Sequence, residues 1–163
     1  MIIKNWNYIL LLISSVSILS ALTAEYFFNL QPCELCLKQR NPYYFIIGLI
    51  LINFFIPISY KIYVFLLIQL SSLYGLFYAV WHVGVENNFL KGPSGCSAGL
   101  DMSSNTVDLK EQILSKQVIS CDEVVWSFFG LSAASINTII LLVIFIFNSI
   151  YIFNYGSKKE KNN

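Results

Sequence analysis

Charged side chains are scarce in this chain of 163 residues. Only 12% of the residues are charged, whereas 56% are hydrophobic. A soluble domain carries about a quarter charged residues, so this chain has too few charges to cover a water-soluble surface. The hydrophobic residues also occur in long runs instead of alternating with polar ones, which is typical of membrane spans. The composition therefore predicts a membrane protein.

Basic residues are few, and they form no patch that would bind nucleic acid. The net charge is +1, and the only basic cluster is the C-terminal tail with Lys158, Lys159 and Lys161. Such a tail is more typical of a cytoplasmic anchor than of a phosphate-binding patch. The chain has a single arginine, Arg40, and a single histidine, His82. No nucleic-acid partner is expected.

Four segments are long enough to cross about 30 Å of hydrocarbon as helices. We expect an all-α membrane protein, a four-transmembrane-helix bundle in which residues 1–163 form a single domain. The expected spans are residues 8–28, 42–59, 62–81 and 124–153, which leave outer loops at 29–41 and 82–123. The first segment offers only poor small-x-small cleavage sites, so we expect a retained span instead of a signal peptide.

The basic residues in the loops predict the orientation of the spans. With both termini inside, five basic residues lie on each side, but those on the inner side occupy much shorter segments. A higher density of lysine and arginine marks the cytoplasmic side. We therefore expect both termini in the cytoplasm and a long periplasmic loop at 82–123, as in a protein of the bacterial inner membrane.

The four cysteines all fall in the two expected outer loops. Cys33 and Cys36 follow the first span, and Cys96 and Cys121 lie between the third and the fourth. Because two crossings separate these loops, all four thiols emerge on one side of the membrane in either orientation. With the termini inside, that side is the periplasm, where disulfides persist.

The spacing of the cysteines favours redox chemistry over metal binding. A Cys-x-x-Cys pair such as Cys33 and Cys36 occurs in redox sites and as half of a zinc site. A zinc site would need a second close pair, whereas Cys96 and Cys121 are widely separated and His82 belongs to no ligand pair. No metal site is predicted, although a zinc-binding module remains an alternative. A structural scaffold with static disulfides is another, and it fits the second pair better than the first.

The residues around the first pair favour an ionised thiol. If they are helical, Cys33, Cys36 and Arg40 share one face near a helix N-terminus, where the helix dipole and the guanidinium both stabilise a thiolate. Pro42 disfavours helical geometry at Asn41, so the second span could instead begin there and leave the pair on a short connector. In both cases Arg40 lies at the membrane surface beside the thiols. Because lysines anchor the rest of the chain, we favour a specific task for this arginine over a snorkelling anchor.

The motif PCELCLKQR at residues 32–40, with a second cysteine pair between spans three and four, resembles the DsbB family of bacterial quinone-dependent disulfide-forming proteins. Further similar segments are WHVGVE at 81–86, GPSGC at 92–96, CDEVVW at 121–126 and FGLSA at 129–133. The sequence departs from the family pattern at Val125, where proline is frequent, and at Ile136, where tryptophan is usual. The resemblance covers most of the chain.

The resemblance implies a protein-disulfide:quinone oxidoreductase that reoxidises a periplasmic thioredoxin-fold thiol oxidase, a DsbA-like partner. Cys96 would form the mixed disulfide with that partner, and Cys121 would then exchange with Cys33. Cys36 would face the quinone. A bulky protein can approach only a flexible outer loop, whereas a pair at the membrane surface can meet a lipid-soluble acceptor. With two cysteine pairs linked by thiol–disulfide exchange, one pair would react with the protein partner and the other with the quinone.

The resemblance also implies a cofactor, a quinone that is either ubiquinone or menaquinone. Arg40 would hold or polarise a quinone carbonyl, and His82 would lie on the quinone side at the outer end of the third span. An interfacial histidine without a task is an equally good interpretation of His82. Glu25, near the end of the first span, is the acid closest to the hydrocarbon, and such residues are candidates for function.

Overall fold

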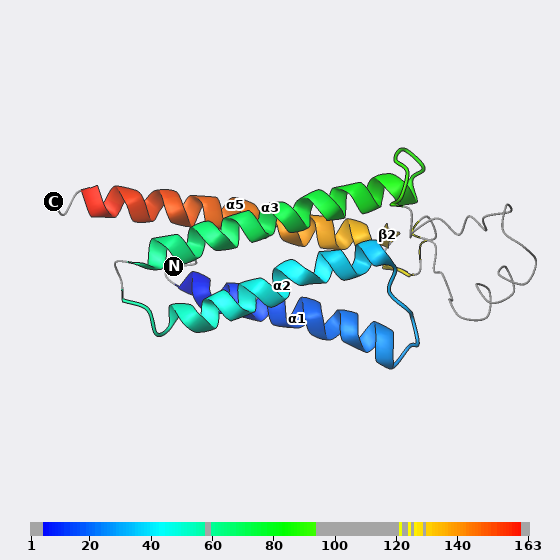
Figure 1. The fold of residues 1–163 in the computed structure, drawn as a ribbon, viewed down its shortest axis with the longest axis horizontal. Coiled ribbons are helices and arrows are strands. Elements are labelled where there is room, and N and C mark those ends of the chain that lie inside the picture. Colours follow the sequence, from blue (N-terminus) through cyan, green and yellow to red (C-terminus); the bar gives the residue numbers. More distant parts are fainter. Residues whose placement is uncertain are drawn as a thin grey trace, which may run out of the picture.

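The computed structural model describes residues 5–57, 60–93, 121, 124, 126–128 and 130–160, and the account below concerns these residues. They form four long helices and one short hairpin (Figure 1). In chain order the elements are α1 (Trp6–Tyr26), α2 (Glu34–Asn53), α3 (Lys61–Glu86), β1 (Ser127–Phe128), β2 (Leu131–Ser132) and α5 (Ala133–Glu160).

The helices form an elongated bundle whose two ends differ in content. Helix α3 packs against α2 and α5, and α2 packs in turn against α1. The start of α1 and the end of α5 lie at one end of the bundle (Figure 1). The opposite end gathers the end of α1, the start of α2, the end of α3 and the start of α5. Parts of all four helices therefore meet there.

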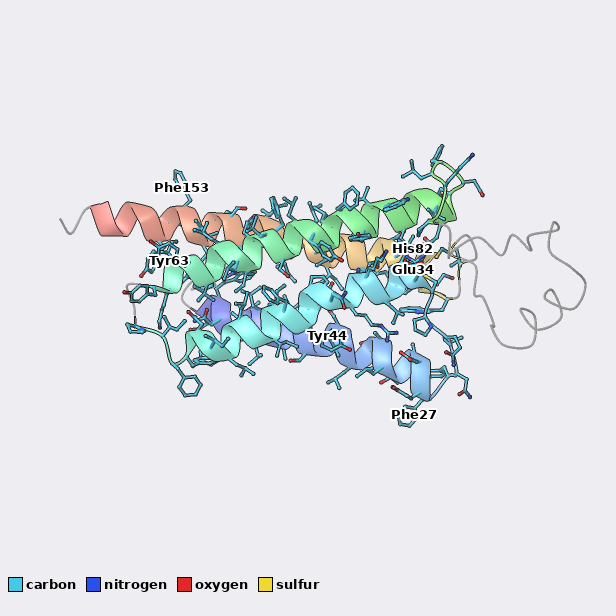
Figure 2. The ribbon with its side chains drawn as sticks, viewed as in Figure 1. Phe27, Glu34, Tyr44, Tyr63, His82 and Phe153 are labelled. Atoms are coloured by element: carbon cyan, nitrogen blue, oxygen red, sulfur yellow. The ribbon has the colours of Figure 1, made fainter. Side chains whose placement is uncertain are left out.

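The outer face of the bundle carries many large apolar side chains. Large side chains such as Leu10, Phe65 and Leu141 are fully buried between the helices, whereas Phe27 and Phe153 are more than three-quarters exposed and project outward (Figure 2). Among the described residues, three helical segments are long and apolar enough to cross a membrane: Trp6–Tyr26, Lys61–Glu86 and Ala133–Tyr155. An apolar surface of this extent is what lipid would cover. The prediction of a helical membrane protein is therefore supported for three of the four expected spans.

The second expected span differs from the prediction. Helix α2 begins at Glu34 and continues through Pro42, so Asn41 does not cap a new helix, and the Cys-x-x-Cys lies at a helix start instead of on a connector. Packing explains the continuity, because Pro42 is buried against Gly75 of α3 and its carbonyl accepts a hydrogen bond from Ser71 Oγ at 3.3 Å. With three charged residues in its first two turns, α2 is not among the three helices that are apolar enough by themselves.

The third expected span also extends further than predicted. Residues 82–86 were expected to open the outer loop, but α3 continues to Glu86. His82 therefore projects from a helix and is buried, with 4% of its surface exposed. Asn88, which has a positive φ of 59°, turns the chain after the helix.

The fourth expected span was predicted to begin near Val124, and this part of the prediction is wrong. Strands β1 and β2 pair in antiparallel fashion before α5 begins at Ala133. Gly130 turns the chain between them with a φ of 79°, a conformation that favours glycine. Ser132 then accepts a hydrogen bond from the backbone N–H of Ser135 at 3.1 Å, as a helix N-cap does. The glycine and the serine therefore place the helix start nine residues later than the apolar run does.

Buried amides connect the helices at the end that holds the start of α1. Asn148 of α5 accepts a hydrogen bond from Trp6 Nε1 at 3.3 Å and donates one to Gln69 Oε1 at 2.7 Å. Gln69 of α3 donates in turn to Ser149 Oγ at 2.8 Å. Because hydrogen bonds between polar side chains join helices that are otherwise apolar, these bonds fix the register of α1, α3 and α5.

Candidate redox site

Helix α2 begins at the first cysteine of the Cys-x-x-Cys. Cys33 is the N-cap residue, with an extended backbone (φ −72°, ψ 170°), and its Sγ accepts a hydrogen bond from the N–H of Cys36 at 3.3 Å. The N–H of Leu37 donates to the Cys33 carbonyl at 3.1 Å and so closes the first helical turn. A sulfur in this position faces the unpaired N–H groups and the positive end of the helix dipole, and both favour a thiolate.

The two thiols of this pair are free and lie close together. Their Sγ atoms are 2.9 Å apart and share a hydrogen bond, so small side-chain movements would bring them to the ~2.05 Å of a disulfide. The hydrogen bond from Cys36, helped by His82, lowers the pKa of Cys33 to about 4, although burial acts in the opposite direction. The charge of the reduced pair therefore rests on Cys33.

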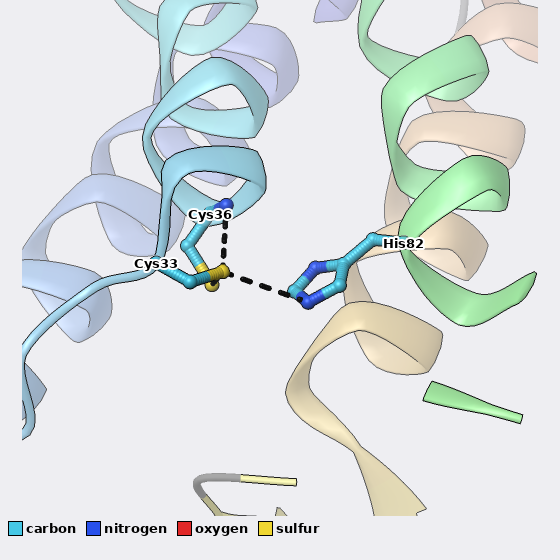
Figure 3. Close-up of side chains that lie close together, drawn as sticks. All are labelled: Cys33, Cys36 and His82. Carbon is cyan, nitrogen blue, oxygen red and sulfur yellow. Dashed lines mark hydrogen bonds between the residues drawn. The ribbon is translucent and has the colours of Figure 1, made fainter. Parts of the chain in front are cut away.

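The histidine of α3 completes a compact group with the two thiols. His82 Nε2 lies 3.6 Å from Cys33 Sγ, and Figure 3 shows the imidazole pointing from α3 toward the two sulfur atoms. The other ring nitrogen, Nδ1, lies 2.9 Å from Nε2 of Gln39 on α2. His82 was expected on the quinone side, and the structure places it in contact with the thiol pair.

Gln39 belongs to a chain of buried hydrogen bonds that reaches α5. Its Oε1 accepts a hydrogen bond from Asn137 Nδ2 at 2.7 Å, and Asn137 Oδ1 accepts one from the hydroxyl of Tyr43 at 2.5 Å. Gln39 is only 5% exposed. Sequence reasoning assigned no role to Gln39, Tyr43 or Asn137.

The single arginine forms an ion pair with the acid at the end of α1. Arg40 Nη1 donates to Glu25 Oε2, and Nη2 donates to the Ala21 carbonyl at 3.4 Å. The side chains of Arg40 and Glu25 are only 14% and 21% exposed. Arg40 is therefore held between α1 and α2, one helical turn after Cys36, and does not extend outward as a snorkelling anchor would.

The second cysteine pair is described only in part. Cys121 is disulfide-bonded and fully buried, and it belongs to the same buried cluster as Cys33, Leu35 and Val85. Cys96 lies outside the described residues. The three described cysteines lie in one cluster at the same end of the bundle.

A cavity of about 270 Å³ opens beside the thiol pair, and most of its lining is apolar. Cys33, Cys36, Arg40 and His82 all contribute to its wall, together with residues of α1 and α5. An engineered apolar cavity of about 150 Å³ accepts benzene, so this one has room for a six-membered ring. Five of its lining residues also line a second apolar groove along α1: Val16, Ser20, Ala24, Leu30 and Trp126.

Comparison with known proteins identifies the family. Residues 4–151 match the model of the family described as disulfide bond formation protein DsbB. The chain belongs to the DsbB family. It is 29% identical over 124 residues to a disulfide bond formation protein B of Methylobacillus flagellatus, with 73% of this chain and 74% of that protein covered. It is also 27% identical over 158 residues to an uncharacterised protein of Rickettsia prowazekii, with 96% and 91% covered. No solved structure matches the chain significantly.

Membership of the DsbB family confirms the resemblance predicted from the cysteine motifs, and it implies a membrane-bound oxidoreductase that forms disulfides. The structure agrees with such chemistry, because it brings a free Cys-x-x-Cys, a histidine and an arginine to one cavity. Of the predicted site residues, Cys33 contacts both Cys36 and His82. Arg40 lines the cavity beside them.

By residue type, the two cysteines and the histidine could also bind a metal ion. The ligand atoms of Cys33, Cys36 and His82 lie within 4.8 Å of one another. Structural zinc takes four ligands, and His82 can serve as one through Nε2 only when that nitrogen carries no proton. The hydrogen bond at Nδ1 therefore decides between a metal ligand and a proton donor, because it sets the tautomer.

Proposed function

We propose that this DsbB-family chain is a protein-disulfide:quinone oxidoreductase with two cysteine pairs, Cys33 with Cys36 and Cys96 with Cys121. It oxidises a periplasmic thioredoxin-fold thiol oxidase, a DsbA-like partner, and passes the electrons to a membrane quinone, either ubiquinone or menaquinone. The observation that carries the proposal is the free thiol pair at the start of α2, which opens onto an apolar cavity that also contains Arg40 and His82.

The residues of the cavity fit a quinone. When bound, a quinone accepts two electrons and two protons and becomes the hydroquinone. The cavity has room for a six-membered ring, and the adjoining groove along α1 is apolar enough for a lipid tail. Arg40 of α2 would donate a hydrogen bond to a carbonyl oxygen of the quinone. His82 lines the same cavity from α3. Glu25 holds the guanidinium at the cavity wall.

The chemistry of the thiols fits a relay between a soluble protein and a membrane acceptor. In the proposed path, a thiolate of the partner attacks Cys96 and breaks the Cys96–Cys121 disulfide, and the released Cys121 thiolate then attacks Cys33. Breaking the Cys33–Cys36 disulfide in this way would free Cys36 as a thiolate at the cavity, one turn before Arg40. The burial of Cys121 in the cluster of Cys33 supports direct exchange between them.

We infer the same topology as the sequence predicts, with both termini in the cytoplasm and the cysteines in the periplasm of a bacterial inner membrane. Helix α2 would be the remaining span besides α1, α3 and α5, and the whole chain would form one membrane domain. Its 20 residues reach about 30 Å at 1.5 Å per residue, and α1 and α3 cover much of its surface. Placing the start of α1 and the end of α5 at the same end of the bundle supports an even number of crossings (Figure 1).

Quinone reduction in a purified system tests this function. The chain in detergent is mixed with a reduced thioredoxin-fold dithiol protein and either a ubiquinone or a menaquinone analogue, and the quinone absorbance is followed. We expect one quinone to be reduced for each dithiol of the partner that is oxidised to a disulfide. Variants Cys33→Ala and Cys36→Ala should each abolish turnover, whereas Ser71→Ala, which keeps all four thiols, is the control. If the intact chain reduces neither quinone, the proposed activity is wrong.

A further inference from the structure

Gln39 is a buried amide that faces groups on two other helices. Its Nε2 lies 2.9 Å from His82 Nδ1 and 3.4 Å from the carbonyl oxygen of Tyr78, both on α3. Its Oε1 accepts the hydrogen bond from Asn137 of α5. This side chain therefore connects the histidine of the thiol site directly to α5.

The Tyr78 carbonyl determines which way the amide of Gln39 points. A carbonyl oxygen can only accept hydrogen bonds, so the atom of Gln39 that faces it has to be the NH₂ nitrogen. The reversed amide would place two oxygens 3.4 Å apart with no proton between them. Asn137 agrees with this orientation, because its Nδ2 donates to the Gln39 oxygen.

The amide orientation then determines the tautomer of the histidine. The nitrogen of Gln39 has no lone pair to offer, so His82 Nδ1 has to accept its hydrogen bond and carries no proton. In a neutral imidazole the proton is then on Nε2, the atom that lies 3.6 Å from Cys33 Sγ. Nε2 is a proton donor in this arrangement and has no lone pair free for a metal ion.

We propose that Gln39 is a positioning residue: it holds His82 as the Nε2–H tautomer, so that the imidazole donates a hydrogen bond to the sulfur of Cys33, and Asn137 with Tyr43 holds Gln39 in place. The chain of donors runs from the Tyr43 hydroxyl on α2 to Asn137 on α5, back to Gln39 and on to α3. The role of this network in turnover rests on the proposed function, but the tautomer and its effect on the thiol do not.

Other charged and titratable groups near the sulfur are few among the described residues. Cys36 faces Cys33 from the same helix, and Arg40 lies one turn further on. Glu86 Oε1 lies 3.9 Å from His82 Nε2, so the carboxylate and the sulfur compete for the same proton. Cys121 belongs to the cluster but is disulfide-bonded and does not titrate. Among the residues that the structure describes, His82 and Cys36 are therefore the side chains placed to donate a hydrogen bond to the Cys33 sulfur.

The tautomer can be measured directly because His82 is the only histidine in the chain. The full chain without a histidine tag is labelled with ¹⁵N-histidine, reduced and studied in detergent by NMR, with neither quinone nor partner present. We expect a protonated Nε2 and an unprotonated Nδ1 in the wild-type protein. In Gln39→Glu the carboxylate can only accept, so Nδ1 should become protonated.

Gln69→Glu is the matched control, because Gln69 is also a buried amide of this bundle and contacts Asn148 and Ser149 instead of the thiol site. This variant should leave the His82 tautomer unchanged. A second readout is the pKa of Cys33 in Gln39→Leu. Without Gln39 the imidazole is no longer held with its proton on Nε2, so the hydrogen bond from His82 to the Cys33 thiolate is lost and this pKa should rise by about 1 to 2. A merely structural role would lower stability without moving the tautomer.

Two results would overturn the proposal. One is a wild-type imidazole with its proton on Nδ1, and the other is a Gln39→Glu protein that folds and keeps the wild-type tautomer. If Gln39→Leu fails to fold, the glutamate variant, which has almost the same shape, still decides. Because no turnover is involved, a chain that reduces no quinone but has the expected tautomer would refute the proposed function and leave this inference standing.

Discussion

The reduced Cys33–Cys36 pair should react with an alkylating reagent at a rate that hardly depends on pH. The perturbation is a change of pH from 8 to 5 in a variant whose other two cysteines are replaced by serine. With the pKa of Cys33 lowered to about 4 by the hydrogen bond from Cys36, the sulfur is still about 90% ionised at pH 5. For a thiol with an ordinary pKa of about 8.5, the ionised fraction falls roughly 800-fold from pH 8 to pH 5.

The rate at a single pH would not distinguish these cases. At pH 7 a lowered pKa increases the ionised fraction about 30-fold over an ordinary thiol. The intrinsic nucleophilicity of a thiolate falls with its pKa, with a Brønsted slope of about 0.4 to 0.5, so it decreases by roughly 100-fold. The two effects nearly cancel. Only the pH dependence separates a stabilised thiolate from an ordinary thiol, and here it should be less than twofold.

The assay is the rate of iodoacetamide modification, followed by mass spectrometry, together with the thiolate absorbance near the peptide edge. Cys33 lines the cavity, so a small reagent can reach it. In Cys36→Ala the first donor is lost, and the pH dependence should return toward that of an ordinary thiol. Cys36→Ser, whose hydroxyl can still donate, should keep the flat profile. An intact pair whose modification rate rises about tenfold per pH unit between 5 and 8 would refute the assignment of the charge to Cys33.

Two further predictions concern the packing around the site. An added Cβ at Gly75 would lie 2.6 Å from the proline ring of α2, so Gly75→Ala should force α2 and α3 apart and destabilise the chain by about 1 to 3 kcal/mol, measured by thermal unfolding in detergent. Gly48→Ala, where no atom lies within 4 Å, should not destabilise it, and equal losses would contradict the packing argument. Glu25→Gln removes the charged partner of Arg40, so the KM for quinone should rise about fivefold with little change in kcat, for about 1 kcal/mol lost. Glu34→Gln, which removes an exposed ion pair, should leave the KM unchanged; a KM that Glu25→Gln does not alter would show that the pair does not position the guanidinium.

Local sequence spacing predicted the part of the site that lies on one helix. Cys33, Cys36 and Arg40 share the first turns of α2, as the i, i+3, i+7 pattern indicated, and the N-cap geometry supplies the expected stabilisation of a thiolate. Proline chemistry favoured a break at Asn41 that does not occur. The contact of Pro42 with Gly75, 33 residues further along the chain, outweighs the local preference, and no local pattern reveals such a contact.

The start of the last helix was placed too early for a similar reason. Hydropathy alone does not separate Val124 and Trp126 from the helix that follows, although they lie before it. Gly130 and Ser132 carried the signal, since a glycine with positive φ and a serine N-cap together end a hairpin and begin a helix. That signal was present in the sequence, but the apolar length was given more weight.

The polar residues within the helices show why the sequence alone could not find the network of Gln39. Asn137 and Asn148 are both amides in the same apolar helix, and both are candidates for function by position. Asn148 connects to Gln69 and Trp6, which carry no titratable group near the thiols. Asn137 connects to Gln39, 98 residues away, and through it to His82. Two amides of the same type, 11 residues apart on one helix, therefore have different consequences, because only one chain of hydrogen bonds ends at the imidazole that contacts the thiol pair.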